Sequence, residues 1–201
     1  MNLSHAIVLT GSISTGKSTV GSLLSLYGFK IIDADKVAHK MLDKNSSEIA
    51  VLFGSEYVSD GKVDRKKLGG LVFNDKEKLK KLEEFLHPLI KEEIKKESLV
   101  CESQDVPYIL DIPLFFENKN YDLNEVAVVY TPKEIQLQRL MSRDNISKEE
   151  AEKKISLQMD IEKKAKQADF VIDNSKNFKH LQKEVDRFVE YIKGKYAHLK
   201  I

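Results

Sequence analysis

The sequence predicts an α/β fold in which a five-stranded parallel sheet is covered by helices on both faces. The apolar run of residues 6–10 reads as a buried strand that leads into a glycine-flanked loop and then a helix. Four further short apolar runs follow, at residues 29–32, 108–112, 126–130 and 168–172. Helical stripes of apolar residues occupy the stretches between and after these runs. Strands that alternate with helices in this way form parallel sheets.

The loop after the first strand carries the most specific chemistry. Residues 11–19 read Gly-Ser-Ile-Ser-Thr-Gly-Lys-Ser-Thr and match the phosphate-binding pattern G-x-x-x-x-G-K-[ST]. Backbone N–H groups must wrap closely around a phosphate chain, and glycine permits this where a side chain would collide. The helix that follows directs its positive end at the same anions. The motif predicts a P-loop NTPase fold that binds a nucleoside triphosphate.

The residues of this loop have distinct expected roles. Gly11 allows the turn off the strand, and Gly16 permits close backbone approach. Lys17 is expected to reach the β- and γ-phosphates, because the lysine of this motif does so. Ser18 supplies a hydroxyl for Mg²⁺, and Thr19 supplies one for the α-phosphate. The loop residues expected around ATP are Gly11, Ser14, Thr15, Gly16, Lys17, Ser18 and Thr19.

Two carboxylates end the second predicted strand. If the strand continues through Asp33-Ala34-Asp35, the two side chains point the same way, because side chains alternate along a strand. They would then face the phosphates, where a carboxylate can act on an acceptor hydroxyl or on Mg²⁺. For Asp33 a second interpretation has equal weight, namely that it caps a helix that begins near Lys36. For Asp35 we favour the functional role.

Residues 36–105 predict a largely helical insertion that binds the acceptor. Asp60-Gly61 marks a turn, and His87-Pro88 is expected to interrupt the helices, with Pro88 in the first turn of the next one. Arg65 and His87 are the notable polar residues here. Each is a candidate for substrate contact. The alternatives are that Arg65 is simply solvated, as arginines on charged helices usually are, and that His87 only caps the helix that begins at Pro88.

The core resumes with the third strand at residues 108–112. Asp111 lies near its end and has two readings, a carboxylate that orients Mg²⁺ through water or an aspartate that merely closes the strand. Glu117 is expected to face the acceptor. Cys101 is expected to be an inert thiol in or near a helix end.

Residues 132–165 predict a helical lid before the last strand. Thr131-Pro132-Lys133-Glu134 opens one helix with a threonine cap, and residues 147–150 form a second capping box. Arg139 and Arg143 are four residues apart and share one helical face. They would neutralise charge on the transferring phosphoryl group while the lid excludes water. The alternative is an exposed charged face of little consequence.

Bulk composition limits the class of protein. The 201 residues are 41% hydrophobic and 32% charged, with a net charge of +1, which suits a globular protein. We expect no nucleic-acid or membrane partner, because the charge is balanced and no apolar run is long enough to span a bilayer. One cysteine excludes an intramolecular disulfide, and we expect a cytoplasmic location.

Taken together, the motifs resemble those of the dephospho-coenzyme A kinase family. The resemblance covers nearly the whole chain. The residues that carry it are the loop at 9–19, Asp33 to Asp35, Asp64-Arg65, residues 87–90, residues 113–117, Arg139 with Arg143 and Asp144, Gln158-Met159, Lys164, and residues 168–174. Ser12 and Ser14 depart from the family pattern, which has glycine at both positions. Both fall on variable positions of the general motif, so phosphate binding is expected to survive.

The resemblance implies transfer of the ATP γ-phosphoryl group to the ribose 3′-hydroxyl of dephospho-coenzyme A, with Mg²⁺ held by Ser18. Asp35 would orient or deprotonate the hydroxyl. The residues expected to be catalytic are Asp35, Lys17, Asp33 and Arg143. Those expected to bind the acceptor are Asp35, Arg65, His87 and Glu117, and Arg139 and Asn174 are expected near ATP.

The organisation that follows is a single kinase domain spanning 1–201. Its core comprises 1–35, 106–131 and 166–201, with the acceptor-binding insertion at 36–105 and the lid at 132–165. We expect a monomer or weak homo-oligomer. The alternatives are another small-molecule or nucleotide kinase and a GTP-binding switch, but no Asn-Lys-x-Asp segment for guanine selectivity is present.

Overall fold

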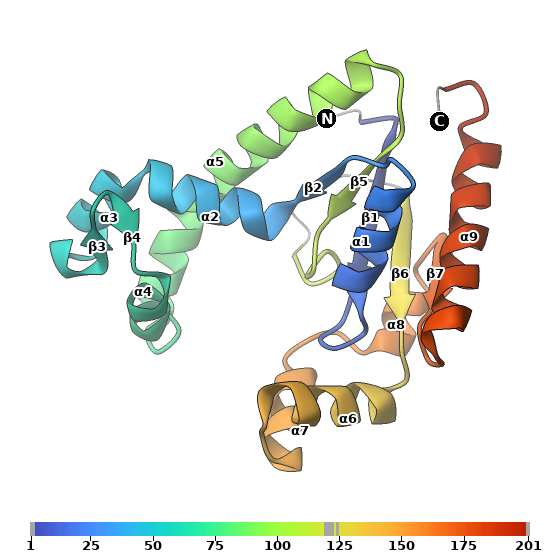
Figure 1. The fold of residues 1–201 in the computed structure, drawn as a ribbon. Helices are drawn as coiled ribbons and strands as arrows, with labels where there is room; N and C mark the ends of the chain where they lie inside the picture. The colour runs from blue at the N-terminus through green and yellow to red at the C-terminus, as the bar shows by residue number, and fades with distance from the viewer. Residues whose placement is uncertain (1–2, 119–122, 124, 200–201) are drawn as a thin grey trace. The chain divides into compact units, whose positions relative to one another are not determined.

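The computed structural model describes residues 3–118, 123 and 125–199. The chain forms two compact units, one made of Met1–Ile32 with Ser98–Ile201 and the other of Asp33–Glu97 (Figure 1). The first unit contains the sheet and the phosphate loop. The second is largely helical.

The sheet has five strands in the order β2-β5-β1-β6-β7. Their bounds are β1 Ala6–Gly11, β2 Ile31–Asp33, β5 Tyr108–Asp111, β6 Val126–Tyr130 and β7 Phe170–Asp173. Strand β1 lies in the middle, with Leu9 opposite Asp111 on one side and Ala127 on the other. The predicted five-stranded parallel α/β fold is confirmed. Because β1 is the central strand, the phosphate loop that follows it lies at the middle of the carboxyl edge of the sheet.

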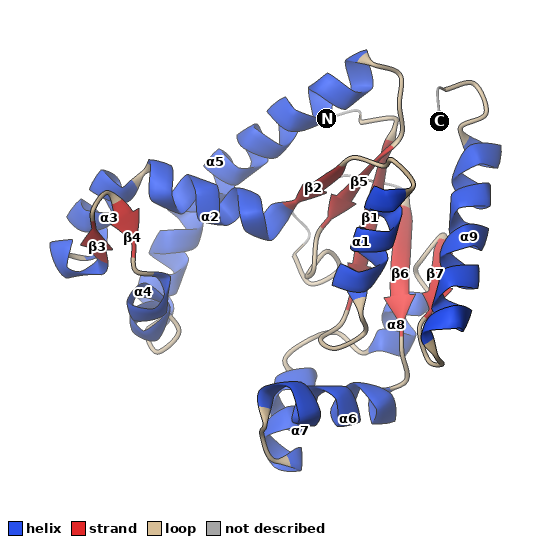
Figure 2. Ribbon diagram, in the orientation of Figure 1, coloured by secondary structure: helices blue, strands red, loops and turns tan. Residues whose placement is uncertain are grey.

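Two long helices pack together on one face of this sheet. They are α1 (Lys17–Leu26) and α9 (Phe178–Lys195), and α8 (Ile161–Ala165) contacts β6 (Figure 2). The stripe predicted for the last helix is confirmed, since Leu181, Val185, Phe188, Val189 and Ile192 are all buried. Each such side chain contributes about 1.5–3 kcal/mol on burial. The helix that begins at the phosphate loop is therefore fixed by the core.

The end of α1 departs from the predicted stripe. Val20 and Leu24 are fully buried, but Tyr27 is 50% exposed. Its phenolic hydroxyl instead donates to Asp186 on α9. The ring of Tyr27 therefore lies at the edge of the core, and its hydroxyl bonds to α9 at the surface.

The lid segment contains α6 (Lys133–Asp144) and α7 (Lys148–Ser156). The capping box at Ser147 and Glu150 is confirmed. The threonine cap predicted for α6 is wrong, because Pro132 is the N-cap residue and no side chain caps the helix. Thr131 is fully buried, and its hydroxyl is used for other contacts described below.

The second unit comprises short helices and a small hairpin. Its elements are α2 Ala34–Lys44, α3 Ser46–Phe53, the 3₁₀ helix η1 Ser55–Tyr57, β3 Val58–Ser59, β4 Lys62–Val63, α4 Arg65–Val72 and most of α5 Lys76–Ser103. The turn at Asp60-Gly61 is confirmed, and both residues have positive φ, at 50° and 71°. Positive φ at both central residues is typical of the tight turn of a β-hairpin.

Two predicted boundaries in this unit are wrong. Strand β2 ends at Asp33 and α2 begins at Ala34, so Asp35 lies in the first helical turn and the alternation argument does not apply. Helix α5 runs through Pro88 without a break. An internal proline costs about 3 kcal/mol or more. Leu86 and Ile94, on either side of it, are buried and hold both halves of the helix.

Cys101 lies near the end of α5, as expected, and it is buried. Over the described residues, none of the helices is both long enough and apolar enough to cross a membrane.

Candidate functional site

The phosphate loop needs glycine for reasons that the structure makes specific. Gly16 has φ of 90°, in the left-handed region. A Cβ atom on Gly16 would lie 2.2 Å from Nδ2 of Asn174, which no packing tolerates. A Cβ on Gly11 would lie 2.7 Å from Oγ1 of Thr15. The close approach here is made by the protein's own side chains.

Those side chains hold the loop through hydrogen bonds to its backbone carbonyls. The Thr15 hydroxyl donates to the carbonyl of Ser12, 2.8 Å away. The carbonyl of Thr15 accepts from Asn174 Nδ2 at 2.8 Å and lies 3.2 Å from the Thr131 hydroxyl. Thr15 and Thr131 are fully buried and Asn174 nearly so, so these bonds are shielded from water. Asn174, expected near ATP, thus supports the loop backbone.

Ser14 occupies one of the two positions where the family pattern has glycine. Its φ is 62°, which costs a residue with a Cβ about 1–2 kcal/mol. Its hydroxyl is buried and makes no hydrogen bond within the described part of the chain. Serine at this position therefore adopts a backbone conformation that glycine would adopt at a lower energetic cost.

Lys17 is the first residue of α1 and forms an ion pair with Asp111 at the end of β5. Both side chains are largely shielded, with 19% and 9% of their surface exposed. Ser18 and Thr19 follow at the helix N-terminus with exposed side chains. The arrangement brings a cation, a carboxylate, two hydroxyls and a helix N-terminus together at the carboxyl end of β1.

The two lid arginines have different surroundings. The Arg139 guanidinium donates to the carbonyl of Asn174 at 2.9 Å and to the Thr131 hydroxyl at 3.4 Å. Arg143 is more exposed and donates to Asp144 at 2.8 Å. Hydrogen bonds from Arg143 and then Lys154 lower the pKa of Asp144 to about 2. Arg139 therefore contacts the loop's supporting residues, whereas Arg143 is held by a surface carboxylate.

Three further residues reach the loop and were not singled out as site residues. The Ile13 N–H donates to Oε1 of Gln158 at 2.8 Å, and the Ser12 hydroxyl lies 3.5 Å from the carbonyl of Met159. Lys164 donates to the carbonyl of Gly11 at 2.8 Å. These contacts join residues about 150 positions apart. The family resemblance includes all three residues, but a local pattern cannot predict which residues they contact. Glu117, expected to face the acceptor, pairs with Lys164 at 2.8 Å.

The remaining candidates belong to the second unit. Asp33 caps α2, since its carboxylate accepts from the N–H of Lys36 at 3.0 Å, and the capping interpretation is confirmed. Asp35 is exposed and makes no hydrogen bond or ion pair with a described residue. Arg65 is the exposed first residue of α4. His87 lies within α5, partly exposed.

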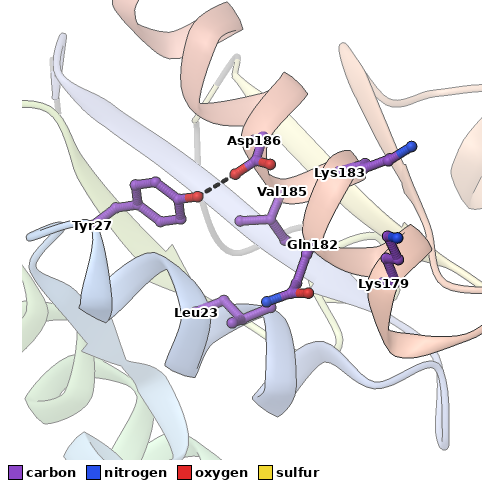
Figure 3. Close-up of a pocket in the computed structure, with 7 residues that line it drawn as sticks. All are labelled: Leu23, Tyr27, Lys179, Gln182, Lys183, Val185 and Asp186. Carbon is purple, nitrogen blue, oxygen red and sulfur yellow. Dashed lines mark hydrogen bonds between the residues drawn. The ribbon is translucent and has the colours of Figure 1, made fainter.

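A separate pocket of about 300 Å³ lies between α1 and α9 (Figure 3). Leu23, Tyr27, Lys183 and Asp186 are among the residues that line it, and the Tyr27–Asp186 hydrogen bond crosses it. None of its lining residues belongs to the phosphate loop, so we assign it no part in nucleotide binding.

Comparison with known proteins decides the family. The family model described as dephospho-CoA kinase matches residues 5–180. The chain belongs to the dephospho-CoA kinase family. The dephospho-CoA kinase of Sulfurimonas denitrificans is 52% identical over 200 residues, which cover 100% of both chains. That of Helicobacter pylori strain J99 is 45% identical, over 94% of this chain and 98% of its own.

A solved structure gives the same result. The dephospho-CoA kinase from Campylobacter jejuni superposes with a TM-score of 0.72 at 38% identity, covering 95% of this chain and 98% of that one. The chain is therefore an enzyme, a kinase that phosphorylates dephospho-CoA with ATP in coenzyme A biosynthesis. The GTP-binding switch and the other small-molecule kinases are set aside.

Proposed function

We propose that this enzyme transfers the γ-phosphoryl group of ATP to the ribose 3′-hydroxyl of dephospho-CoA, giving coenzyme A and ADP in the final step of coenzyme A synthesis. The observation that carries the proposal is the phosphate loop. It leaves the central strand, is held by buried hydrogen bonds, and leads into a helix whose first residue is Lys17. Preorganised donors of this kind stabilise a transferring phosphoryl group without reorganisation.

In this proposal the residues of the loop bind ATP. Backbone N–H groups between Gly11 and Gly16 surround the phosphates, with Ser14 and Thr15 among them. Lys17 neutralises charge on the β- and γ-phosphates, and Thr19 donates to the α-phosphate. Lys17 must then exchange its ion pair with Asp111 for the incoming phosphates. Residues Asn174 to Lys176 approach the adenine.

The residues present fit Mg²⁺. No cluster of three or more acidic, histidine or cysteine side chains that could hold a metal occurs among the described residues. Mg²⁺ is commonly bound by one or two protein groups together with the substrate's phosphates. Ser18 would supply its hydroxyl and Asp111 its carboxylate, directly or through water. The ion would supply charge neutralisation at the transferring phosphoryl group.

Asp35 is proposed as the base. As the 3′-hydroxyl oxygen bonds to the γ-phosphorus and the bond to the ADP oxygen breaks, Asp35 accepts the proton of the hydroxyl. Asp33 is the weaker candidate, because its carboxylate already accepts a hydrogen bond from the N-terminus of α2. The carboxylate of Asp35 makes no such bond within the described residues.

Other residues are proposed to hold the acceptor and the leaving group. Arg65 and His87 would bind the acceptor. A contact between Glu117 and the acceptor would use Oε2, since Oε1 already pairs with Lys164 and accepts from the N–H of Met159. Arg139 and Arg143 would stabilise the charge of the transferring group after the lid closes.

The organisation proposed is one kinase domain over 1–201, with core segments 1–35, 106–131 and 166–201, an acceptor-binding insertion at 36–105 and a lid at 132–165. The enzyme is proposed to act in the cytoplasm, as a monomer or weak homo-oligomer, without a nucleic-acid or membrane partner.

An acceptor panel tests this proposal. The purified chain is incubated with ATP, Mg²⁺ and dephospho-CoA, a nucleoside monophosphate or a sugar, and the phosphorylated product is identified by mass and by ³¹P NMR. We expect a new phosphomonoester on the ribose of dephospho-CoA alone. Phosphorylation of a nucleoside monophosphate, with dephospho-CoA unchanged, would overturn the proposal.

A further inference from the structure

Lys164 is a charged side chain in a place where charge is costly. It lies on α8, is fully buried, and is one of the largest fully buried side chains of the protein. Its ammonium group donates to the carbonyl of Gly11 at 2.8 Å and forms an ion pair with Oε1 of Glu117, 2.8 Å away. Removing an ammonium group from water carries a large desolvation penalty, which an ion pair offsets only when its geometry is good. Stability alone therefore does not explain a lysine here.

Glu117 completes the arrangement. Its Oε1 atom also accepts from the N–H of Met159 at 2.8 Å, and its Oε2 atom is buried without a hydrogen-bond partner among the described residues. One carboxylate oxygen thus holds both the ammonium group of Lys164 and the backbone at the start of the segment that contains it. We call these two residues the Lys164–Glu117 pair.

The carbonyl that Lys164 holds is the first of the phosphate loop. Gly11 is the last residue of β1 and the first of the P-loop motif. The peptide unit is planar, so fixing the carbonyl oxygen of Gly11 also fixes the opposite direction of the N–H of Ser12. Lys164 therefore sets the orientation of a backbone donor in the loop without approaching a ligand itself.

The same segment reaches the next two loop residues. The Ser12 hydroxyl lies 3.5 Å from the carbonyl of Met159, and the N–H of Ile13 donates to Gln158 at 2.8 Å. Residues 158–164, which follow the lid helices, thus contact three successive residues at the start of the loop. The Lys164–Glu117 pair thus joins this segment to the end of β1.

We propose that Lys164 is a positioning residue that sets the phosphate loop for ATP, and that Glu117 holds Lys164 in place and ties the lid's return segment to the loop. The inference rests on the proposed function, since it concerns the same ATP site. Lys164 transfers no group and takes no proton. A purely structural pair would be replaceable by uncharged residues of similar size without loss of ATP affinity, because such replacements are often neutral or stabilising.

The test separates affinity for ATP from folding. Lys164→Met leaves Glu117, whose side chain is only 19% exposed, as an uncompensated carboxylate, so it is expected to lower the melting temperature. The double variant Lys164→Met with Glu117→Gln removes both charges but keeps an acceptor for the Met159 N–H. Its melting temperature is expected to recover toward that of the parent. Lys163→Met, which changes the exposed neighbouring lysine, is the matched control.

ATP affinity is measured by calorimetry without acceptor, and the KM for dephospho-CoA is measured separately. We expect the double variant to bind ATP at least about tenfold more weakly than the parent, since it loses a charged hydrogen bond to the loop. Both the ATP affinity and the KM for dephospho-CoA of the control Lys163→Met should stay unchanged.

The inference would be overturned if the double variant bound ATP as tightly as the parent. It would also be overturned if Lys163→Met lost as much ATP affinity as the double variant. A different acceptor in the panel assay would overturn the proposed function alone. The ATP affinities of the variants would still decide the role of Lys164.

Discussion

The phosphate-loop region and the helical unit of residues 33–97 differ in how their polar side chains are bonded and buried. The loop is held by bonds from distant parts of the chain, such as those from Lys164 to Gly11 and from Asn174 to Thr15, and these partners are buried. In the helical unit the candidate acids bond locally or not at all. Asp33 caps its own helix, and Asp35 is exposed.

This difference separates two tasks. A group that must stabilise charge on a transferring phosphoryl is most effective when its geometry is set before the ligand arrives. A group that must contact an acceptor has to remain exposed until the acceptor binds. Substitutions in the first region should therefore disturb ATP binding and stability, whereas those in the second should act on turnover or on a single helix.

The largest effect is expected for Lys17→Ala. This change removes the cation at the start of α1, and turnover should fall at least about a hundredfold, as it does when a preorganised charge-stabilising donor is lost. Lys36→Ala in the other region is the control, because that side chain is 84% exposed. Steady-state kinetics measure both, and a Lys17→Ala enzyme within a few-fold of the parent would remove Lys17 from the mechanism.

A pair of glycines provides the next contrast. Gly16→Ala is expected to destabilise the fold by about 2 kcal/mol or more, since its φ is 90° and the new Cβ would clash with Asn174. Gly70→Ala lies in α4 with open space around it and should stabilise by about 0.5–1 kcal/mol.

Urea unfolding gives both free energies. Equal effects of the two changes would show that the loop is no more constrained than a surface helix.

Substitutions of Asp33 distinguish a helix-capping role from a role as the catalytic base. Asp33→Ala should cost about 1 kcal/mol of stability through loss of the cap on α2, and Asp33→Asn should retain most of it. Turnover should stay close to that of the parent in Asp33→Asn. If Asp33→Asn folds normally but loses turnover, Asp33 is the base and Asp35 is not.

The smallest effect concerns the lid carboxylate at Asp144. Arg143 and Lys154 lower its pKa from the usual 3.8 to about 2. A lowered pKa means that the ion pair stabilises the folded state fully above the unfolded pKa and loses this effect as the pH falls toward 2. An NMR titration should give a midpoint near 2, and Arg143→Ala should raise it. A midpoint of 3.8 in the parent would mean that Arg143 is not held by Asp144.

Sequence reasoning was most successful where signals are local. The loop motif, the capping box at Ser147 and the stripe of the last helix each depend on residues within a few positions of one another. The break predicted at Pro88 failed because packing on both sides outweighs a local penalty. The sequence predicts a cap at Thr131, because its distant partners Thr15 and Asn174 cannot be inferred from its neighbours.

The supporting residues of the loop are the clearest case of what sequence alone leaves out. Lys164 and Gln158 lie in a charged stretch that looks like an exposed helix, and only the fold brings them to Gly11 and Ile13. Asp35 shows the reverse. Its residue type and place after a strand indicated a role, but the strand ends before it and its side chain belongs to a helix.

The most direct test of the contrast between the two regions is the substitution Asp35→Asn, with ATP affinity and turnover measured on the same protein. The change removes the proposed base but leaves every described contact of the phosphate loop in place. We expect ATP affinity within about twofold of the parent and turnover reduced by at least about a hundredfold, the scale of a lost general base. Near-normal turnover, or a parallel loss of ATP affinity, would contradict the account.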